Sequence, residues 1–339
     1  MSRIVVLGGT GYFGRLAVDL LREAGATPLV AARRSGDLRV DVEDGASIKG
    51  ALRAGDVALD IVGPFQARTT ALVEAAIDVG FHVVDVSDAP GYSEKLVALA
   101  DRIAEAGIAV CTSCSSLSAV SAALVRRSGI EAPARVSAFL RPATAHTANP
   151  ATAASAFRSL GRPIRALREG RLVDEVGMRA SRTFDWPAPI GRARGRLLEG
   201  ADVVNLPRIW PSLREVDFWV DPNVPGLSAL LGLAARASFV RWIFERTQSV
   251  GLVLARALGG TVGVFAVEIE GADGRVVRLV LSGPAHTERT AVVPATLAAR
   301  AIAEGRLTAR GLVPHDRQVD PDALFEALEA AGIGCVRDG

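Results

Sequence analysis

Short apolar runs alternate with helical patterns over the first 128 residues of the chain. The runs are rich in β-branched residues and predict six strands, at 4–7, 29–32, 39–42, 56–62, 82–86 and 108–111. Apolar residues at helical spacing predict helices between them, the last two at 93–106 and 117–127. Because strands joined through helices pair in parallel, this rhythm predicts a doubly wound α/β sheet.

The pattern changes after about residue 128. Longer strands are predicted at 136–140, 216–220, 263–269 and 276–281, and the last two flank a turn that contains Asp273-Gly274. Such a turn favours a hairpin with antiparallel pairing. The segment 142–212 is rich in proline, glycine and arginine, and its periodicity is too weak to predict any element. We therefore expect a second, α+β domain with a largely antiparallel sheet.

Residues 225–258 form a helical stretch with apolar faces. These faces carry large side chains, namely Leu230, Leu231, Leu233, Phe239, Trp242 and Ile243. We expect them to serve as core or as a dimer surface rather than to attach the chain to a membrane. The reason is that charges interrupt the stretch, at Arg236, Arg241, Glu245 and Arg246. A final helix is predicted from Asp320 as N-cap and Pro321 in the first turn to a stop at Gly332.

Composition narrows the class of protein. Hydrophobic residues make up 49% of the 339 and charged residues 22%, as in a folded globular protein. The 39 basic and 37 acidic side chains leave a formal charge of +2, which indicates neither a nucleic-acid nor an acidic-membrane partner. Three cysteines give no disulfide framework. The N-terminus has no secretory signal, so we expect a cytoplasmic protein.

A glycine-rich loop follows the first predicted strand. Gly9-x-Gly11-x-x-Gly14 stands between that strand and an amphipathic helix, the context of a dinucleotide-binding loop. In such a loop Gly9 permits the turn, Gly11 lets the backbone approach a pyrophosphate and Gly14 lets helix and strand pack closely. We predict a Rossmann-type domain whose loop contacts the cofactor through Gly8, Gly9, Thr10, Gly11, Tyr12, Phe13 and Gly14.

The end of the second predicted strand indicates which dinucleotide is bound. An acid there would hold the adenosine ribose 2′-hydroxyl of NAD, but the chain has Arg33 and Arg34. Guanidinium groups bind a 2′-phosphate, whereas a carboxylate would repel it. The sequence therefore favours NADP(H) over NAD(H).

Three stretches carry a family resemblance. The loop 8–14, the stretch Asp60-Ile61-Val62-Gly63-Pro64-Phe65-Gln66 and residues 74–88 resemble the saccharopine dehydrogenase NADP-binding-domain family. Residues 113–118 are similar to the turn after the sixth strand of that family. The matching covers about the first 128 residues and is looser beyond them.

The resemblance implies an NADP-dependent oxidoreductase with a second domain that often mediates dimerisation. It also implies that Val62, Gly63, Pro64 and Phe65 lie beside the ribose and nicotinamide, and that Asp41 lies near the adenine. The family reduces C=N, C=O or activated C=C bonds, imine reduction included. We assign residues 1–128, with 290–339 packed back on them, to the NADP-binding domain, and 129–289 to a substrate and dimerisation domain.

Cys111 and Cys114 form a C-x-x-C pair, but the chain has no second pair to complete a metal site, so we predict no metal. Cys114 can also be interpreted by itself, apart from the pair. It follows the sixth strand and precedes a helix, where a thiolate is stabilised, so it is a candidate nucleophile of a semialdehyde dehydrogenase. A tyrosine–lysine mechanism is excluded, because Tyr92 and Lys95 are one residue too close for Tyr-x-x-x-Lys.

We expect a substrate cleft beyond the carboxyl ends of the parallel strands, with Cys114, Ser115 and Ser116 on one wall and His146 opposite. His146 and His286 are both candidates for acid–base work near neutral pH, and His146 is the better placed. The leading hypothesis is a dimeric, NADP(H)-dependent oxidoreductase of a small metabolite. The alternatives are a non-catalytic dinucleotide-binding sensor or partner protein, and a Cys114-dependent semialdehyde dehydrogenase.

Overall fold

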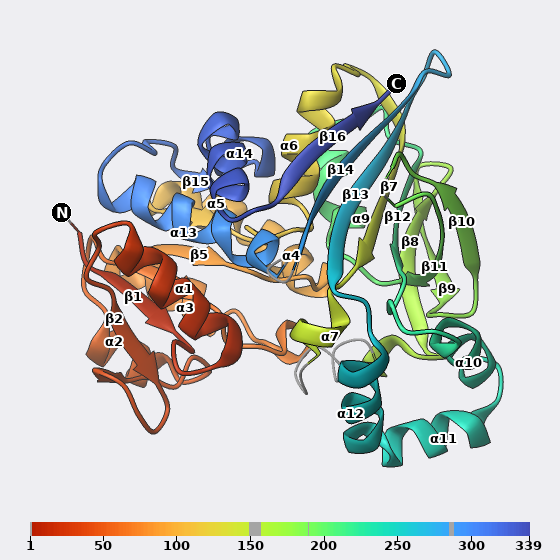
Figure 1. Cartoon of the computed structure of the whole chain (residues 1–339). Helices are drawn as coiled ribbons and strands as arrows, with labels where there is room; N and C mark the ends of the chain where they lie inside the picture. The colour runs from red at the N-terminus through yellow and green to blue at the C-terminus, as the bar shows by residue number, and fades with distance from the viewer. Residues whose placement is uncertain (1, 149–156, 189, 285–287) are drawn as a thin grey trace. The chain divides into compact units, whose positions relative to one another are not determined.

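The computed structural model describes residues 2–148, 157–188, 190–284 and 288–339. The chain forms two compact units, each built from two segments. Unit 1 holds residues 1–122 and 289–324, and unit 2 holds 123–288 and 325–339 (Figure 1).

Unit 1 is built on a seven-stranded parallel sheet. Its strands are β1 (Ile4–Leu7), β2 (Leu29–Ala32), β3 (Leu38–Arg39), β4 (Val57–Asp60), β5 (His82–Asp85), β6 (Ala109–Cys111) and β15 (Gly311–Leu312). They lie in the order β3-β2-β1-β4-β5-β6-β15. The order reverses between β1 and β4, which makes their carboxyl ends the switch point of a Rossmann-type sheet. The predicted fold class is confirmed.

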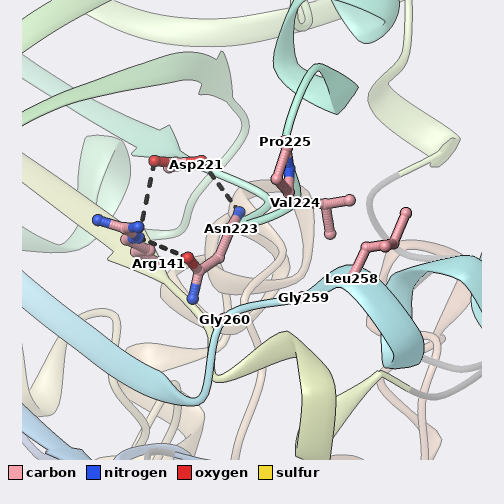
Figure 2. A pocket seen from close by; sticks show the side chains of 8 residues that line it. All are labelled: Arg141, Asp221, Asn223, Val224, Pro225, Leu258, Gly259 and Gly260. Carbon is pink, nitrogen blue, oxygen red and sulfur yellow. Dashed lines mark hydrogen bonds and ion pairs between the residues drawn. The ribbon is translucent and has the colours of Figure 1, made fainter.

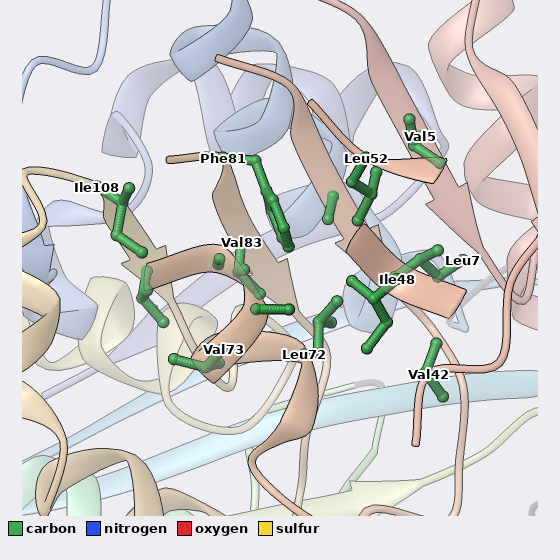
Figure 3. Packing of buried hydrophobic residues seen from close by; sticks show 14 of the residues in the cluster. Val5, Leu7, Val42, Ile48, Leu52, Leu72, Val73, Phe81, Val83 and Ile108 are labelled. Atoms are coloured by element: carbon green, nitrogen blue, oxygen red, sulfur yellow. The ribbon is translucent and has the colours of Figure 1, made fainter. Parts of the chain in front are cut away.

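Helices cover both faces of this sheet. They are α1 (Tyr12–Glu23), α2 (Gly45–Ala51), η1 (Phe65–Ala67), α3 (Ala71–Val79), α4 (Pro90–Val97), α5 (Ala100–Glu105), α13 (Arg289–Ala303) and η3 (His315–Arg317). Because strand side chains alternate, Val5 and Leu7 pack on one face with Leu72, and Ile4 and Val6 on the other with Leu21. Figure 3 shows the first of these two cores.

Unit 2 is built on a mixed sheet in the order β10-β11-β12-β7-β13-β14-β16. Its strands are β7 (Pro133–Arg141), β8 (Pro163–Arg168), β9 (Arg171–Val176), β10 (Ser181–Asp185), β11 (Arg192–Leu198), β12 (Glu215–Val220), β13 (Val262–Gly271), β14 (Val276–Pro284) and β16 (Gly334–Asp338). β7 and β12 pair in parallel, whereas the other pairs are antiparallel. The predicted hairpin of β13 and β14 and the largely antiparallel sheet are confirmed.

Four strands, β8 to β11, lie in the segment for which the sequence predicts no element. β9 and β10 bury few apolar side chains, so their pattern in the sequence is weak. β11 does alternate arginines with Ala193, Gly195 and Leu197, a period-two signal that the sequence analysis did not assign to a strand. The core beside β10 is aromatic: the rings of Phe184 and Trp186 lie 5.3 and 5.4 Å from that of Phe139. Packing across the sheet, which a linear pattern does not record, holds these strands.

The helices of unit 2 are α7 (Thr144–Thr147), α9 (Asp202–Asn205), η2 (Leu206–Arg208), α10 (Leu227–Ala234), α11 (Ser238–Arg246) and α12 (Gln248–Leu258). Two further helices, α6 (Ala119–Ser128) and α14 (Pro321–Ala330), cross the division between the units. Asp320 caps α14 as predicted, since its carboxylate accepts from the Ala323 N–H at 2.9 Å. None of the helices in the described ranges is long and apolar enough to span a bilayer.

The division of the chain differs from the sequence-based boundaries at 128 and 289. The first boundary falls inside α6, and residues 325–339 belong to unit 2 rather than to the nucleotide domain. The reason for the second difference is β16, which pairs with β14 and so extends the second sheet. One predicted helix, 93–106, is two helices, α4 and α5.

Candidate functional site

The glycine loop lies between β1 and α1 at the switch point of unit 1. Three of its glycines are required by close packing. A Cβ on Gly14 would lie 2.0 Å from the Gly8 carbonyl oxygen, and one on Gly9 would lie 3.0 Å from Val30. Gly8 has a φ of +78°, and its Cβ would lie 2.9 Å from Val62. These contacts bring the ends of β1, β2 and β4 together around the loop.

Gly11 differs from the other three glycines. Its Cβ would meet one described atom within 4 Å, the Gly8 carbonyl oxygen at 3.2 Å. Gly11 is the N-cap of α1, so the helix starts without a capping side chain and without an acidic residue in its first turn. N–H groups and the positive end of the helix dipole are therefore presented to an anion, as a pyrophosphate site requires.

The remaining loop residues surround this helix start. The Thr10 carbonyl accepts a hydrogen bond from Arg15 Nε at 2.9 Å, which brings a guanidinium to the loop. Tyr12 is exposed, and its ring meets that of Phe13 edge to face at 5.1 Å. A hollow of about 290 Å³ beside the loop is lined by Gly9, Thr10, Arg15, Val18, Asp19, Arg22 and Val30.

Arg33 and Arg34 follow β2 directly and are exposed. Within the described ranges, neither guanidinium is recorded with a hydrogen bond or an ion pair. The next acid along the chain, Asp37, turns back onto the strand, where its carboxylate accepts from the Val30 N–H at 2.8 Å. The end of β2 thus presents two positive groups, while the Asp37 carboxylate is held by the backbone. This combination suits a 2′-phosphate.

Asp41 shapes the start of the next turn. Its carboxylate accepts from the Glu43 N–H at 3.1 Å, and its own N–H donates to Ser47 Oγ at 3.0 Å. These bonds lead the chain into α2, which Asp44 caps through the Ala46 N–H. The proximity of Asp41 to an adenine stays a prediction.

A buried ion pair holds the loop after β4. Asp60 is fully buried at the strand end, and its carboxylate accepts from the Val62 N–H at 3.0 Å. Arg68 Nη2 lies 2.9 Å from Asp60 Oδ2, and Nη1 donates to the Val62 carbonyl at 2.7 Å. Burial raises the pKa of the Asp60 carboxyl, and the positive charge of Arg68 opposes that rise.

This ion pair fixes which part of the 62–65 loop is accessible. Gly63 and Pro64 are exposed, whereas Phe65 is 5% exposed and its ring packs on Tyr92 at 5.4 Å. The expectation that Val62, Gly63 and Pro64 lie beside a ribose and nicotinamide stays a prediction. The Phe65 side chain packs in the core of the domain, so Phe65 would contact a bound cofactor through its backbone and not through its ring.

A second buried carboxylate, Asp85, closes β5. Its Oδ1 accepts from the N–H groups of Ser87 and Ser113, both at 2.9 Å, and its carbonyl accepts from the Cys114 N–H at 2.7 Å. Burial raises the pKa of Asp85 to about 6, although the two backbone hydrogen bonds oppose that rise. Asp85 therefore holds the loop after β6 against β5.

The structure corrects the expectation of a stabilised thiolate at Cys114. The side chain is fully buried, and desolvation raises the pKa of its thiol well above the usual value. The helix after β6 begins at Ala119, five residues further on, so Cys114 is not at its first turn. A nucleophile needs both access and a lowered pKa, and Cys114 has neither.

Ser115 and Ser116 use their hydroxyl groups inside unit 1. Ser115 Oγ donates to the Ala291 carbonyl at 3.0 Å, and Ser116 Oγ lies 2.9 Å from the Thr290 hydroxyl. Both partners belong to the first turn of α13. These bonds tie the loop after β6 to a helix that comes about 170 residues later in the chain.

The two candidate histidines are in the second part of the chain. His146 is on α7 in unit 2, where its imidazole is exposed. His286 lies outside the described residues. His146 as a catalytic acid stays a prediction.

Unit 2 has a hollow of about 370 Å³ at the carboxyl ends of β7 and β12 (Figure 2). Arg141 Nε donates to Asn223 Oδ1 at 2.7 Å and lies 3.8 Å from the Asp221 carboxylate, which fixes the guanidinium. The apolar side is formed by Val224, Pro225 and Leu258. The hollow thus places a fixed guanidinium and its carboxylate partner beside an apolar wall, as in sites for small ligands with polar groups.

Sequence reasoning missed the polar residues that support the loops: the buried Asp60, Arg68, Asp85 and Tyr92, and the exposed Glu43. Glu43 pairs with Arg68 at 2.5 Å, and burial raises the pKa of Tyr92. A signal for two of them was present, since Asp60 and Asp85 each end a buried strand of a parallel sheet, where ligands bind.

The comparisons with known proteins agree with this geometry. The model of the saccharopine dehydrogenase NADP binding domain matches residues 4–111. Among solved structures, saccharopine dehydrogenase (L-Glu forming) from Saccharomyces cerevisiae matches with a TM-score of 0.62 and 15% identity, over 100% of both chains. This match shows the fold.

Two further structures overlap more weakly. A meso-dapdh mutant with DAP from Clostridium tetani E88 has a TM-score of 0.46 and 13% identity, over 97% of this chain and 99% of that one. GenD2 from gentamicin A biosynthesis, in complex with NAD, has a TM-score of 0.43 and 15% identity, over 100% and 97%. A search of curated proteins found no significant match.

The domain match and the geometry of the β1–α1 loop agree on one role. Residues 4–111 include the strand, the glycine loop, the helix start and the loop after β4 that surround the switch point. They support a dinucleotide cofactor and an NAD(P)-dependent oxidoreductase. Residues 4–111 of this chain match the model of the saccharopine dehydrogenase NADP-binding domain.

Proposed function

We propose that the protein is an NADP(H)-dependent oxidoreductase that reduces a C=N, C=O or activated C=C bond of a small metabolite. One observation carries the choice of cofactor: two exposed arginines end β2, and the nearby Asp37 carboxylate is held by the Val30 backbone. A 2′-phosphate would be neutralised there, and a 2′-hydroxyl would find no carboxylate partner.

Each part of the site has a separate role in this proposal. The start of α1 at Gly11 would hold the pyrophosphate, and Arg33 with Arg34 would hold the 2′-phosphate. Asp60 and Arg68 fix the backbone of Val62, so that the exposed Gly63 and Pro64 keep one position beside the loop. The bound nicotinamide would supply or accept a hydride.

Two alternatives make different predictions. A non-catalytic dinucleotide-binding protein would bind NADPH without turnover on a panel of imines, ketones and enones. A Cys114-dependent semialdehyde dehydrogenase would lose its turnover on treatment with iodoacetamide. The burial of Cys114 argues against the second, so we expect turnover that iodoacetamide does not inhibit. The homodimer and the cytoplasmic location stay predictions.

The decisive experiment compares NADPH and NADH binding by fluorescence titration. In the Arg33→Ala/Arg34→Ala variant, each lost charge-assisted hydrogen bond should cost about 1.5–3 kcal/mol of NADPH binding free energy. NADH affinity should not change, because NADH has no 2′-phosphate.

A matched control is Arg102→Ala, which removes an exposed arginine from α5 and should leave both affinities unchanged. Equal affinities of the wild-type protein for NADPH and NADH would overturn the choice of cofactor. Binding of neither dinucleotide would overturn the function itself.

A further inference from the structure

Three consecutive helices of unit 2, α10, α11 and α12, carry an unusual amount of exposed apolar surface. In the described residues, twelve large hydrophobic side chains are exposed, and eight of them lie on these three helices. They are Leu230, Leu233, Phe239, Trp242, Ile243, Val253, Leu254 and Leu258, between 39% and 70% exposed. The sequence predicts core or a dimer surface here. Core is wrong for Leu230, Leu233, Phe239, Trp242 and Ile243, and the dimer surface stays a prediction.

The outer side of α11 shows the pattern most clearly. Phe239, Trp242 and Ile243 are spaced so that they share one side of the helix, and the rings of Phe239 and Trp242 stack at 5.9 Å. Val240 and Phe244 instead pack against the core around Leu231. The inner side thus anchors the helix, while the outer side presents aromatic rings that the fold of unit 2 does not use.

Positive charge is concentrated in the same segment. Residues 225–261 contain four arginines, Arg236, Arg241, Arg246 and Arg256, and one acid, Glu245, which gives +3. The whole chain carries +2, so the rest of it sums to −1. The Arg246 guanidinium lies 4.5 Å from the centre of the exposed Trp242 ring.

Three guanidinium groups of this segment donate to backbone carbonyl oxygens. Arg236 donates to the Gly232 carbonyl at 2.8 Å, Arg241 to Gly161 at 3.1 Å and Arg256 to Ala148 at 3.0 Å. Carbonyl oxygens orient a guanidinium without neutralising it. The segment therefore joins exposed apolar side chains to a net positive charge.

We propose that α10–α12 bind in the plane of an anionic lipid surface. Tryptophan, phenylalanine and leucine side chains would enter the boundary between headgroups and acyl chains, and the arginines would contact lipid phosphates. This proposal departs from the sequence-based expectation, which took the charges of the stretch as evidence against attachment to a membrane. A helix that lies in the interface keeps its polar groups at the headgroups, so these charges are compatible with this placement. A second copy of the chain fits less well, since it would bring two +3 segments together.

Vesicle binding of the full-length protein tests the proposal. The protein should sediment with vesicles that contain phosphatidylglycerol, bind pure phosphatidylcholine vesicles at least about tenfold more weakly, and lose affinity as salt is added. Brominated lipids should quench the fluorescence of Trp242. This quenching is specific, because Trp186, Trp210 and Trp219 are only 4–6% exposed.

Two variants with matched controls locate the surface. Phe239→Ser/Trp242→Ser should weaken vesicle binding by about tenfold or more, whereas Leu172→Ser, which changes an exposed apolar residue on β9, should not. Arg246→Gln should reduce binding to anionic vesicles, whereas Arg192→Gln on β11 should not. Unchanged circular dichroism and NADPH binding would show that the variants are folded.

Three results would overturn the proposal. They are the absence of binding to anionic vesicles, equal binding by wild type and the Phe239/Trp242 variant, and conversion of a dimer to a monomer by that variant without any change in vesicle binding. The last result would assign the surface to a second copy of the chain. None of them depends on the dinucleotide site, so failure here is distinguishable from failure of the proposed oxidoreductase.

Discussion

Two loops of unit 1 follow parallel strands and precede helices, yet they have opposite properties. The loop after β1 ends at Gly11, and the helix that follows it has no side-chain cap. The loop after β6, residues 112–118, is closed: the buried Asp85 accepts from the Ser113 N–H, and the Ser115 and Ser116 hydroxyls bond to the start of α13. As sequence patterns, both loops consist of a strand, small residues and a helix.

The difference between them shows what makes a binding site at the edge of such a sheet. Both loops lie at the carboxyl end of a strand, so this position alone does not make a binding site. A ligand binds to polar groups that have no hydrogen-bond partner within the fold, because the ligand supplies the missing partner. The β1 loop keeps its helix start open, and the β6 loop uses its polar groups to hold the domain together.

The largest effect is expected from Gly14→Ala, which should disrupt the backbone conformation of the loop between β1 and α1. The new Cβ would lie 2.0 Å from the Gly8 carbonyl oxygen and 2.7 Å from the Gly9 Cα, so the backbone must move. We expect a loss of about 3 kcal/mol in the free energy of unfolding, together with the loss of NADPH binding. Urea unfolding measures the first and fluorescence titration the second.

The control for this variant is Gly50→Ala in α2, where an added Cβ has no described atom within 4 Å. It should be neutral or more stable by about 0.5–1 kcal/mol. A Gly14→Ala variant as stable as the wild type would contradict the packing role of this glycine.

Gly11→Val should separate binding from folding in the same loop. Gly11 has a φ of −75° and a ψ of 176°, which valine adopts, and its Cβ would meet only the Gly8 carbonyl oxygen at 3.2 Å. The side chain would occupy the space of the pyrophosphate, so NADPH affinity should fall more than about 1,000-fold, or about 4 kcal/mol. Circular dichroism and urea unfolding should stay near native. Normal NADPH binding by this variant would mean that the phosphate loop is misassigned.

Asp85→Asn tests how the β6 loop is closed. The pKa of Asp85 is raised from 3.8 to about 6, so between these pH values the unfolded chain releases a proton that the folded protein keeps. Wild-type stability should therefore fall as pH rises from about 4 to 6, by about 3 kcal/mol from this group alone. The asparagine variant keeps an acceptor for the Ser87 and Ser113 N–H groups and should lack this contribution.

Urea unfolding of both proteins at pH 4, 5, 6 and 7.5 isolates this contribution, because other titrating groups cancel in the difference between them. The stability of the variant relative to wild type should rise through this range and then level off. A difference that does not change with pH would show that the Asp85 pKa is not raised.

The smallest effect is expected from Ser115→Ala/Ser116→Ala. The two hydroxyls bond to Ala291 and Thr290, so their loss should cost about 1 kcal/mol of folding free energy each. NADPH affinity should not change, because these groups face α13. Thermal unfolding and titration of the same samples check both statements. A large drop in turnover at unchanged stability would instead return these serines to the substrate wall where the sequence places them.

The sequence alone determined the nucleotide-binding part of this protein. The loop from Gly8 to Gly14, its place between strand and helix, and the two arginines after the second strand are local features, so a linear pattern records them. The parallel pairing of the strands followed from the same alternation, whereas their order in the sheet comes from the structure. The pattern also located the last helix, because Asp320 and Gly332 act on neighbouring residues.

Only the tertiary structure decided which other residues are available for chemistry. Cys114 is small and polar enough for a loop nucleophile, but residues far along the chain bury it. The core beside β10 forms because the rings of Phe139, Phe184 and Trp186, from segments far apart in the sequence, pack together. Burial depends on contacts between segments that are distant in sequence, so a linear pattern identifies which residues are apolar or reactive but not which of them the fold covers.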